Sequence, residues 1–235
     1  MKIWRVAIGV SILSASALAT TVSGYNFGFS GSGDGLQELI LNGGTITLNA
    51  TDMGWWDNTG FSDNTNTNYI VGFCSVCADP YFNNFFVFSL ASVDVPITSA
   101  TLSVFNPSSG YSSSLPTEVY QVGSVSTPIA ALTAGGTGQV GIYNALASGT
   151  VYGTTVVSAA TDNAQVIIPL DAAAIAALNG AEGGSIALGG TLFDPVSAVP
   201  EPSTFGLAGV GAVILLWFAR RMTQVSKDPR SRAQI

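Results

Sequence analysis

Residues 97–105 read Ile97-Thr98-Ser99-Ala100-Thr101-Leu102-Ser103-Val104-Phe105, and their apolar and polar side chains alternate. Successive side chains of an extended chain point to opposite faces, so Ala100, Leu102 and Val104 share one face while Thr101 and Ser103 share the other. A period of two with one apolar face predicts a half-buried β-strand.

Similar short segments recur on both sides of this strand, between turns rich in Gly, Pro, Asn and Ser. Residues 20–197 form a stretch of about 175 residues, enough for one domain with a full core. The repeated pattern predicts an all-β fold, an antiparallel β-sandwich of jelly-roll-like arrangement. We expect its other strands at residues 45–50, 69–73, 85–90, 118–122, 139–143, 151–157, 165–170 and 185–192.

One segment of the predicted domain departs from this pattern. Residues 171–180 begin with Asp171, continue through alanines and end with Asn179-Gly180. A carboxylate is a good helix N-cap, alanine favours the helix interior, and Asn-Gly stops a helix. We therefore expect one short helix before the last strand, with Ile175 and Leu178 packed on the sheet.

The distribution of charge restricts the possible functions. Residues 20–199 contain twelve acidic residues and no lysine, arginine or histidine, so their formal charge is −12. Nucleophilic catalysis usually needs a histidine base, phosphoryl transfer needs basic groups, and nucleic-acid binding draws its affinity from Lys and Arg. We expect a protein that is not an enzyme and does not bind nucleic acid. Carboxylate-only glycoside hydrolysis and calcium coordination remain open.

The N-terminus has the features of a secretory signal peptide. A short basic region with Lys2 and Arg5 precedes the apolar residues 6–13, and the small residues Ala17 and Ala19 frame a cleavage site after Ala19. We predict that residues 1–19 direct the chain to the Sec machinery and are removed by signal peptidase. The alternative is a retained membrane anchor.

The C-terminus combines three elements in residues 198–235. The triplet Pro200-Glu201-Pro202 is followed by the uncharged segment 203–219 and then by Arg220-Arg221. As a helix this segment spans about 25 Å, and flanking arginines that reach the interface let it cross the hydrocarbon core of about 30 Å. We predict a transmembrane helix with its basic flank in the cytoplasm and the acidic domain outside. A rigid linker before an ordinary anchor is the alternative interpretation of the triplet.

This tail resembles the PEP-CTERM sorting signal of exported bacterial proteins, although the basic tail after Arg221 is longer than is usual in that family. The resemblance implies that an exosortase recognises the triplet and removes the anchor, so the protein passes from the inner membrane to the cell surface or extracellular matrix. It also implies a host that makes exopolysaccharide. In addition, residues 83–102 are similar to a β-sandwich module that recurs in PEP-CTERM proteins, and this implies no activity.

Two adjacent tryptophans, Trp55 and Trp56, are candidates for carbohydrate binding, because a flat aromatic ring stacks on a sugar ring. Neighbours in a strand point to opposite faces, so we expect one ring in the core and the other free for solvent or a ligand. The alternative places one ring in the core and the other under a loop.

The loop that follows carries Asp57 and Asp63 among several asparagines and threonines, and these oxygen ligands suit calcium. Turns favour the same residues because their side chains bond to the local backbone, so a purely structural role is the alternative. We expect no cofactor other than this possible calcium ion.

Cys74 and Cys77 are the only cysteines of the chain. A zinc site would need two more ligands, which the sequence does not offer. An exported protein reaches an oxidising compartment, so we predict a local disulfide between these two cysteines. Taken together, the sequence predicts a non-enzymatic envelope or matrix protein associated with exopolysaccharide or biofilm. A calcium-dependent carbohydrate-binding module is the alternative, and a carboxylate-only glycosidase is less favoured.

Overall fold

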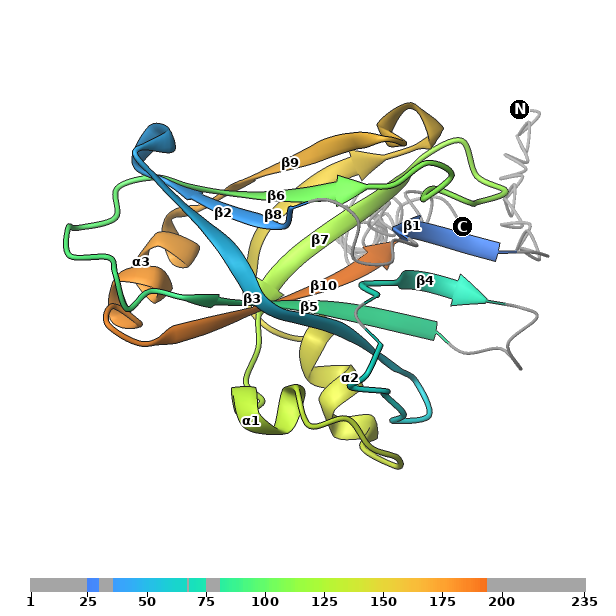
Figure 1. Cartoon of the computed structure of the whole chain (residues 1–235). Coiled ribbons are helices and arrows are strands. Elements are labelled where there is room, and N and C mark those ends of the chain that lie inside the picture. The colour runs from blue at the N-terminus through green and yellow to red at the C-terminus, as the bar shows by residue number, and fades with distance from the viewer. Residues whose placement is uncertain (1–24, 30–35, 67, 75–80, 194–235) are drawn as a thin grey trace, which may run out of the picture.

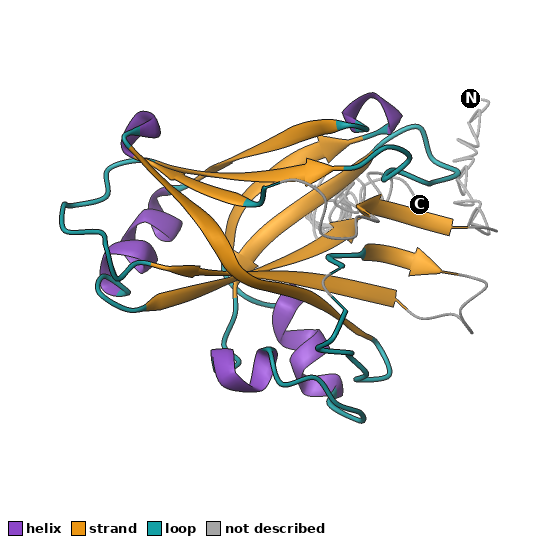
Figure 2. Ribbon diagram, viewed as in Figure 1, coloured by secondary structure: helices purple, strands orange, loops and turns teal. Residues whose placement is uncertain are grey.

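The structure is a computed structural model, and it describes residues 25–29, 36–66, 68–74 and 81–193. The described residues form ten strands, three α-helices and two 3-10 helices (Figures 1 and 2). The strands are β1 Tyr25–Phe29, β2 Glu38–Leu41, β3 Ile46–Asp57, β4 Val71–Cys74, β5 Tyr81–Ser89, β6 Ala100–Asn106, β7 Glu118–Ser124, β8 Val151–Val157, β9 Ala164–Leu170 and β10 Ser185–Phe193. The helices are η1 Asn42–Gly44, α1 Ile129–Leu132, α2 Val140–Ala147, η2 Ala159–Thr161 and α3 Ala172–Gly180.

All strands belong to one continuous antiparallel sheet with the order β8-β7-β10-β5-β3-β2-β6-β9, and β4 joins β1 to the first residues of β5. The long strand β3 links the two halves of the sheet, because its first residues pair with β2 and its last residues pair with β5. The register shifts between Ala50 and Asp52, where the strand passes from one half to the other (Figure 1).

The two ends of this strand order approach each other, so the sheet is nearly closed. The backbone N–H of Asp171, directly after β9, donates to the carbonyl of Tyr152 in β8 at 2.8 Å. The prediction of an antiparallel all-β fold is confirmed. The predicted sandwich of separate sheets is not, because β3 is shared by both halves and keeps the pairing continuous.

The main core lies inside the curved sheet and includes the fully buried side chains of Leu39, Phe86, Phe88, Leu102 and Tyr120. A second, smaller core lies on the other face of β5, where α1 and α2 cover the sheet. It contains Trp56, Phe85, Val87, Leu132, Leu146 and Ala187. Strand β5 is therefore buried on both faces, which explains its run of aromatic and aliphatic residues.

The predicted elements agree unevenly with the structure. Strand β8 has the predicted bounds 151–157, and α3 begins after Asp171, whose Oδ1 accepts a hydrogen bond from the N–H of Ala174 at 2.9 Å. The strand predicted at 139–143 is wrong, because these residues begin α2. Helices α1 and α2 and strands β1 and β2 had no counterpart in the prediction.

Candidate functional site

A pocket with a volume of about 170 Å³ is lined by residues at the end of the sheet that carries β4. Figure 1 shows where β4 lies. The walls of the pocket come from β4, β5, β7, β10 and α2, so residues far apart in the sequence meet there. The lining residues are Gly72, Phe73, Tyr81, Phe82, Asn83, Glu118, Tyr143, Thr191 and Leu192. None of them was singled out by the sequence analysis, because they are brought together only by the strand order.

Aromatic rings form one side of this pocket. The ring centroids of Phe73 and Tyr81 lie 4.7 Å apart, with an angle of 34° between the ring planes. Tyr81 is 49% exposed, whereas Tyr143 of α2 is only partly accessible. Burial raises the pKa of the Tyr143 hydroxyl, and the nearby groups of Tyr81 and Asp57 raise it further.

The polar part of the lining is buried. Asn83 is 3% exposed and donates from Nδ2 to the carbonyl of Tyr143 at 3.2 Å, so the amide ties β5 to α2. Glu118, the first residue of β7, is 1% exposed. Burial raises the pKa of Tyr111, and among the smaller contributions the charge of Glu118 raises it as well. Thr191 of β10 is also buried. The pocket lining thus includes aromatic rings, an amide and a hydroxyl, together with Glu118 at the start of β7.

Trp55 and Trp56 do not lie at this pocket, and both are buried, at 7% and 0% exposure. Their side chains point to opposite faces of β3, as expected, but both faces are covered. Trp56 packs beneath the helices and donates from Nε1 to the carbonyl of Leu132 at 2.9 Å. The ring of Trp55 meets Phe61 and Phe82 at centroid distances of 5.9 and 5.0 Å. Neither ring is exposed in the structure, so the structure gives no support to carbohydrate binding by this pair, and that role stays a prediction.

Asp57 and Asp63 hold the turns of their own loop. Oδ1 of Asp57 accepts hydrogen bonds from the backbone N–H groups of Thr59 and Phe61 and from the Thr59 hydroxyl, at 2.6 to 2.9 Å. Oδ1 of Asp63 accepts from the hydroxyl and the N–H of Thr65, and these bonds lower the pKa of Asp63. The geometry supports a structural role for these residues, and the calcium site stays a prediction.

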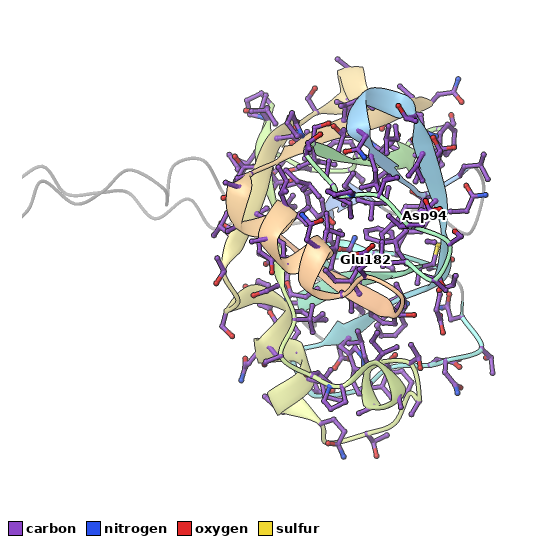
Figure 3. All side chains as sticks on the ribbon, turned by 90° about the vertical axis from the view of Figure 1, so that its left-hand side faces the viewer. Asp94 and Glu182 are labelled. Carbon is purple, nitrogen blue, oxygen red and sulfur yellow. The ribbon has the colours of Figure 1, made fainter. Side chains whose placement is uncertain are left out.

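Acidic side chains elsewhere in the described part of the chain do not form a metal centre. Asp94 and Glu182 lie on the end of the molecule that carries α3, on neighbouring segments (Figure 3). Within the described ranges, no group of three or more Asp, Glu, Cys or His residues is placed to hold a metal ion.

Cys74 is fully buried beside Trp55 and Phe82, and it is disulfide-bonded. Cys77, the only other cysteine of the sequence, lies outside the described residues, so the pairing of these two residues stays a prediction. Its expected effect is to fix the chain at the end of β4, next to the pocket residue Phe73.

The predicted processing and sorting residues also lie outside the described residues. They are the signal-cleavage residues Ala17 and Ala19 and the C-terminal residues Pro200, Glu201, Pro202, Arg220 and Arg221. Among the residues that the structure describes, no helix is both long enough and apolar enough to cross a membrane. The predicted membrane segment 203–219 is not among them.

Comparison with known protein families identifies one region of the chain. Residues 198–221 match the PEP-CTERM protein-sorting motif, which confirms the resemblance noted from the triplet and the arginine pair. The motif indicates an exported protein with a C-terminal sorting signal, and it implies recognition by an exosortase. No curated protein and no solved structure matches the chain.

Proposed function

Because residues 198–221 form a PEP-CTERM protein-sorting motif, we propose that the chain is a non-enzymatic protein of the cell envelope or extracellular matrix, associated with exopolysaccharide or biofilm. The motif is the observation that carries this proposal. In this proposal, the signal peptide ends at Ala19, the body crosses the inner membrane, and the C-terminal helix holds it there until an exosortase cuts at the triplet.

The fold connects the body closely to the sorting segment. Strand β10 ends at Phe193, and only a short stretch of chain separates Leu192, at the pocket, from Pro200. Eight residues span at most about 28 Å when fully extended. Before cleavage, the pocket end of the domain is therefore tethered near the outer surface of the inner membrane. Cleavage at the triplet would release this end.

The lack of basic residues supports a non-enzymatic role, since residues 20–199 offer no imidazole, ammonium or guanidinium group. The pocket residues support the same view. A carboxylate-only glycosidase needs two acidic groups about 5 to 9.5 Å apart. Among the described residues that line the pocket, Glu118 is the only acidic one. Loss of polysaccharide cleavage on replacement of two specific acids would revive the glycosidase alternative.

The sorting proposal is tested in the native host by fractionation, protease protection and mass spectrometry of both chain ends. We expect a mature N-terminus at Thr20, a body accessible from outside the inner membrane, and a C-terminus that lacks Arg220-Arg221. A variant with Pro200 and Pro202 replaced by Ala should keep its C-terminus and remain in the inner membrane. Residues 30–190 protected in the cytosol would refute the proposal.

A second candidate function is carbohydrate binding, and the pocket favours it. The ring pair of Phe73 and Tyr81 offers an aromatic surface, and Asn83 and Thr191 offer polar groups beside it. Carbohydrate binding at this pocket does not involve calcium in our proposal, since the carboxylates of Asp57 and Asp63 accept hydrogen bonds within their own loop. Glycan-array binding that is saturable, unaffected by chelator and lost in Tyr81→Ala would support it. Binding that collapses on chelation would instead revive the calcium-dependent module.

A further inference from the structure

Exposed aromatic and apolar side chains lie at the pocket and beside it. The rings of Phe73 and Tyr81, paired residues of β4 and β5, lie 4.7 Å apart, and Tyr81 is 49% exposed. Tyr143 of α2 lines the same pocket and is partly accessible. Val140 precedes Tyr143 by three residues, so it lies on the same side of α2, and it is 41% exposed. We call these four residues the aromatic patch.

The aromatic patch lies at the end of the domain from which the chain continues to the sorting motif. Leu192, near the end of β10, lines the pocket together with three of the four patch residues. Strand β10 ends at Phe193, and the uncharged segment 203–219 begins ten residues later. Ten residues span at most about 35 Å when fully extended. With segment 203–219 in a bilayer, the patch is therefore held close to the membrane surface.

The chemistry of the aromatic patch suits the interface between lipid and water. Tyrosine is enriched at membrane interfaces, because its ring enters the apolar layer while its hydroxyl stays hydrated. Tyr81 and Tyr143 supply two such side chains, and Phe73 and Val140 add apolar surface beside them. Glu118 also lines the pocket, but at 1% exposure it presents no charge at the surface. The described residues of the patch itself are uncharged at neutral pH.

The charge of the body determines which lipids the patch can meet. Residues 20–199 carry a formal charge of −12 and no basic residue, so they do not attract anionic headgroups as a polybasic segment does. Zwitterionic headgroups have no net charge and avoid the repulsion. The contact also needs little affinity of its own, because a short flexible tether gives an effective concentration in the millimolar range. A small aromatic patch is sufficient for docking under these conditions.

We propose that the aromatic patch docks on zwitterionic lipid at the outer surface of the inner membrane while the chain is anchored, and that cleavage at the triplet uncovers it. This inference rests on the anchoring proposed above, because it requires segment 203–219 to span the membrane. It adds a regulation of the pocket to that proposal. The bilayer covers the pocket before cleavage, and the pocket becomes accessible to other ligands afterwards.

The test is hydroxyl-radical footprinting of the full-length chain in phosphatidylcholine vesicles, with mass spectrometry as the readout. The comparison is a variant with about 40 Gly and Ser residues inserted after Ser197, which lowers the effective concentration of the patch at the bilayer about tenfold. We expect Tyr81 and Tyr143 to be oxidised severalfold more slowly in the parent than in this variant. Val95 follows Asp94 at the α3 end of the molecule and should be oxidised equally in both (Figure 3).

Substitutions locate the contact at the patch. Tyr81→Ser removes an exposed ring and should abolish most of the protection of Tyr143. Val140→Ser and Val95→Ser form a matched pair, because both valines are 41% exposed and only Val140 belongs to the patch. Val140→Ser should reduce the protection of Tyr143, and Val95→Ser should leave it unchanged. Phosphatidylglycerol in the vesicles should weaken the protection through repulsion of the acidic body, and added salt should restore it.

The docking proposal is overturned if Tyr81 is oxidised equally in the parent and the insertion variant, or if Tyr143 stays fully protected in Tyr81→Ser. Protection that increases with phosphatidylglycerol would also overturn it. Protection that disappears when the protein is diluted within the vesicles would show that a second copy, and not lipid, covers the patch. Flotation of the vesicles separates docking from anchoring. A chain that does not float refutes the anchoring and the docking with it, whereas floating without protection of Tyr81 refutes the docking alone.

Discussion

The hydroxyl of Tyr120 donates a hydrogen bond to Oδ1 of Asn84 at 2.8 Å, and both side chains are completely buried. Tyr120 belongs to β7 and Asn84 to β5, and these strands lie on either side of β10. The bond therefore passes over β10 at Gly190, which pairs with Asn84. Nδ2 of Asn84 in turn donates to the carbonyl of Tyr69 at 2.9 Å. The buried polar groups of these three residues are therefore linked to one another by hydrogen bonds inside the core.

Gly190 leaves the space in which this hydrogen bond forms. A Cβ atom at this position would overlap the Tyr120 hydroxyl and Oδ1 of Asn84. We predict that Gly190→Ala lowers the free energy of unfolding by about 3 kcal/mol, because it overpacks the core and separates a buried donor from its acceptor. Urea unfolding followed by circular dichroism measures this change.

The control for this experiment is Gly141→Ala in α2. Nothing lies within 4 Å of a Cβ atom at Gly141, and alanine favours a helix over glycine. We expect this variant to be as stable as the parent or more stable by about 1 kcal/mol. Equal effects of the two substitutions would show that the close approach at Gly190 has no energetic importance.

The same tyrosine predicts a loss of stability in alkali. Burial raises the pKa of Tyr120 well above its ordinary value of 10.0, and the hydrogen bond with Asn84 offsets only part of this effect. The folded state keeps the phenol protonated while the unfolded state releases the proton above about pH 10. The contribution to stability is therefore complete below pH 10 and falls as the pH rises further.

We expect Tyr120→Phe to be less stable than the parent at pH 8 by about 1 to 3 kcal/mol, because Oδ1 of Asn84 loses a buried donor. Its stability should then fall less steeply than that of the parent between about pH 10 and 11.5. Tyr111 and Tyr143 also have raised pKa values and remain in both proteins, so the difference between the two curves isolates Tyr120. Parallel curves would contradict the assignment.

The sequence predicts the elements whose local signals and tertiary environment agree. Strand β8 alternates between exposed and less exposed residues from Gly153 to Val157, and α3 has an N-cap, a helix-forming interior and a stop signal. The segment 139–143 has the pattern of a strand, because Val140 and Ile142 alternate with other residues. Tertiary packing makes this segment a helix instead: Leu146 is buried, and Ile142 and Tyr143 pack against the second core, which contains Trp56.

The candidate site was harder to predict from the sequence than the fold. Alternation correctly indicated that Trp55 and Trp56 point to opposite faces, but it contains no information on α1 and α2, which cover the outer face. The pocket residues Phe73, Glu118 and Thr191 are separated by long stretches of sequence, and only the neighbouring positions of β4, β5, β7 and β10 bring them together. A local motif cannot record such an arrangement.

Asp171 allows a direct test of the helix cap that the sequence did predict. Its carboxylate accepts a hydrogen bond from the N–H of Ala174, and α3 closes the end of the main core with Ala174 and Leu178. We expect Asp171→Ala to lower the free energy of unfolding by about 1 kcal/mol. Asp171→Asn keeps an acceptor at the cap and should lose only a few tenths of this amount. Thermal unfolding of the two variants compares them, and equal losses would argue against a role of the cap.

Substitutions in the loop after β3 can distinguish a structural role of its aspartates from metal binding. Asp57 accepts three hydrogen bonds through one oxygen, two of them from backbone N–H groups, so Asp57→Ala should destabilise the protein by about 2 kcal/mol. Addition of calcium or of a chelator should leave the unfolding temperature of the parent unchanged, because a ligand raises it only by binding the folded state. Asp63→Ala is the milder comparison, since Asp63 is exposed and, among the described residues, its carboxylate accepts hydrogen bonds from Thr65 alone. A rise in the unfolding temperature with calcium that disappears in Asp57→Ala would restore the metal site and overturn the structural assignment.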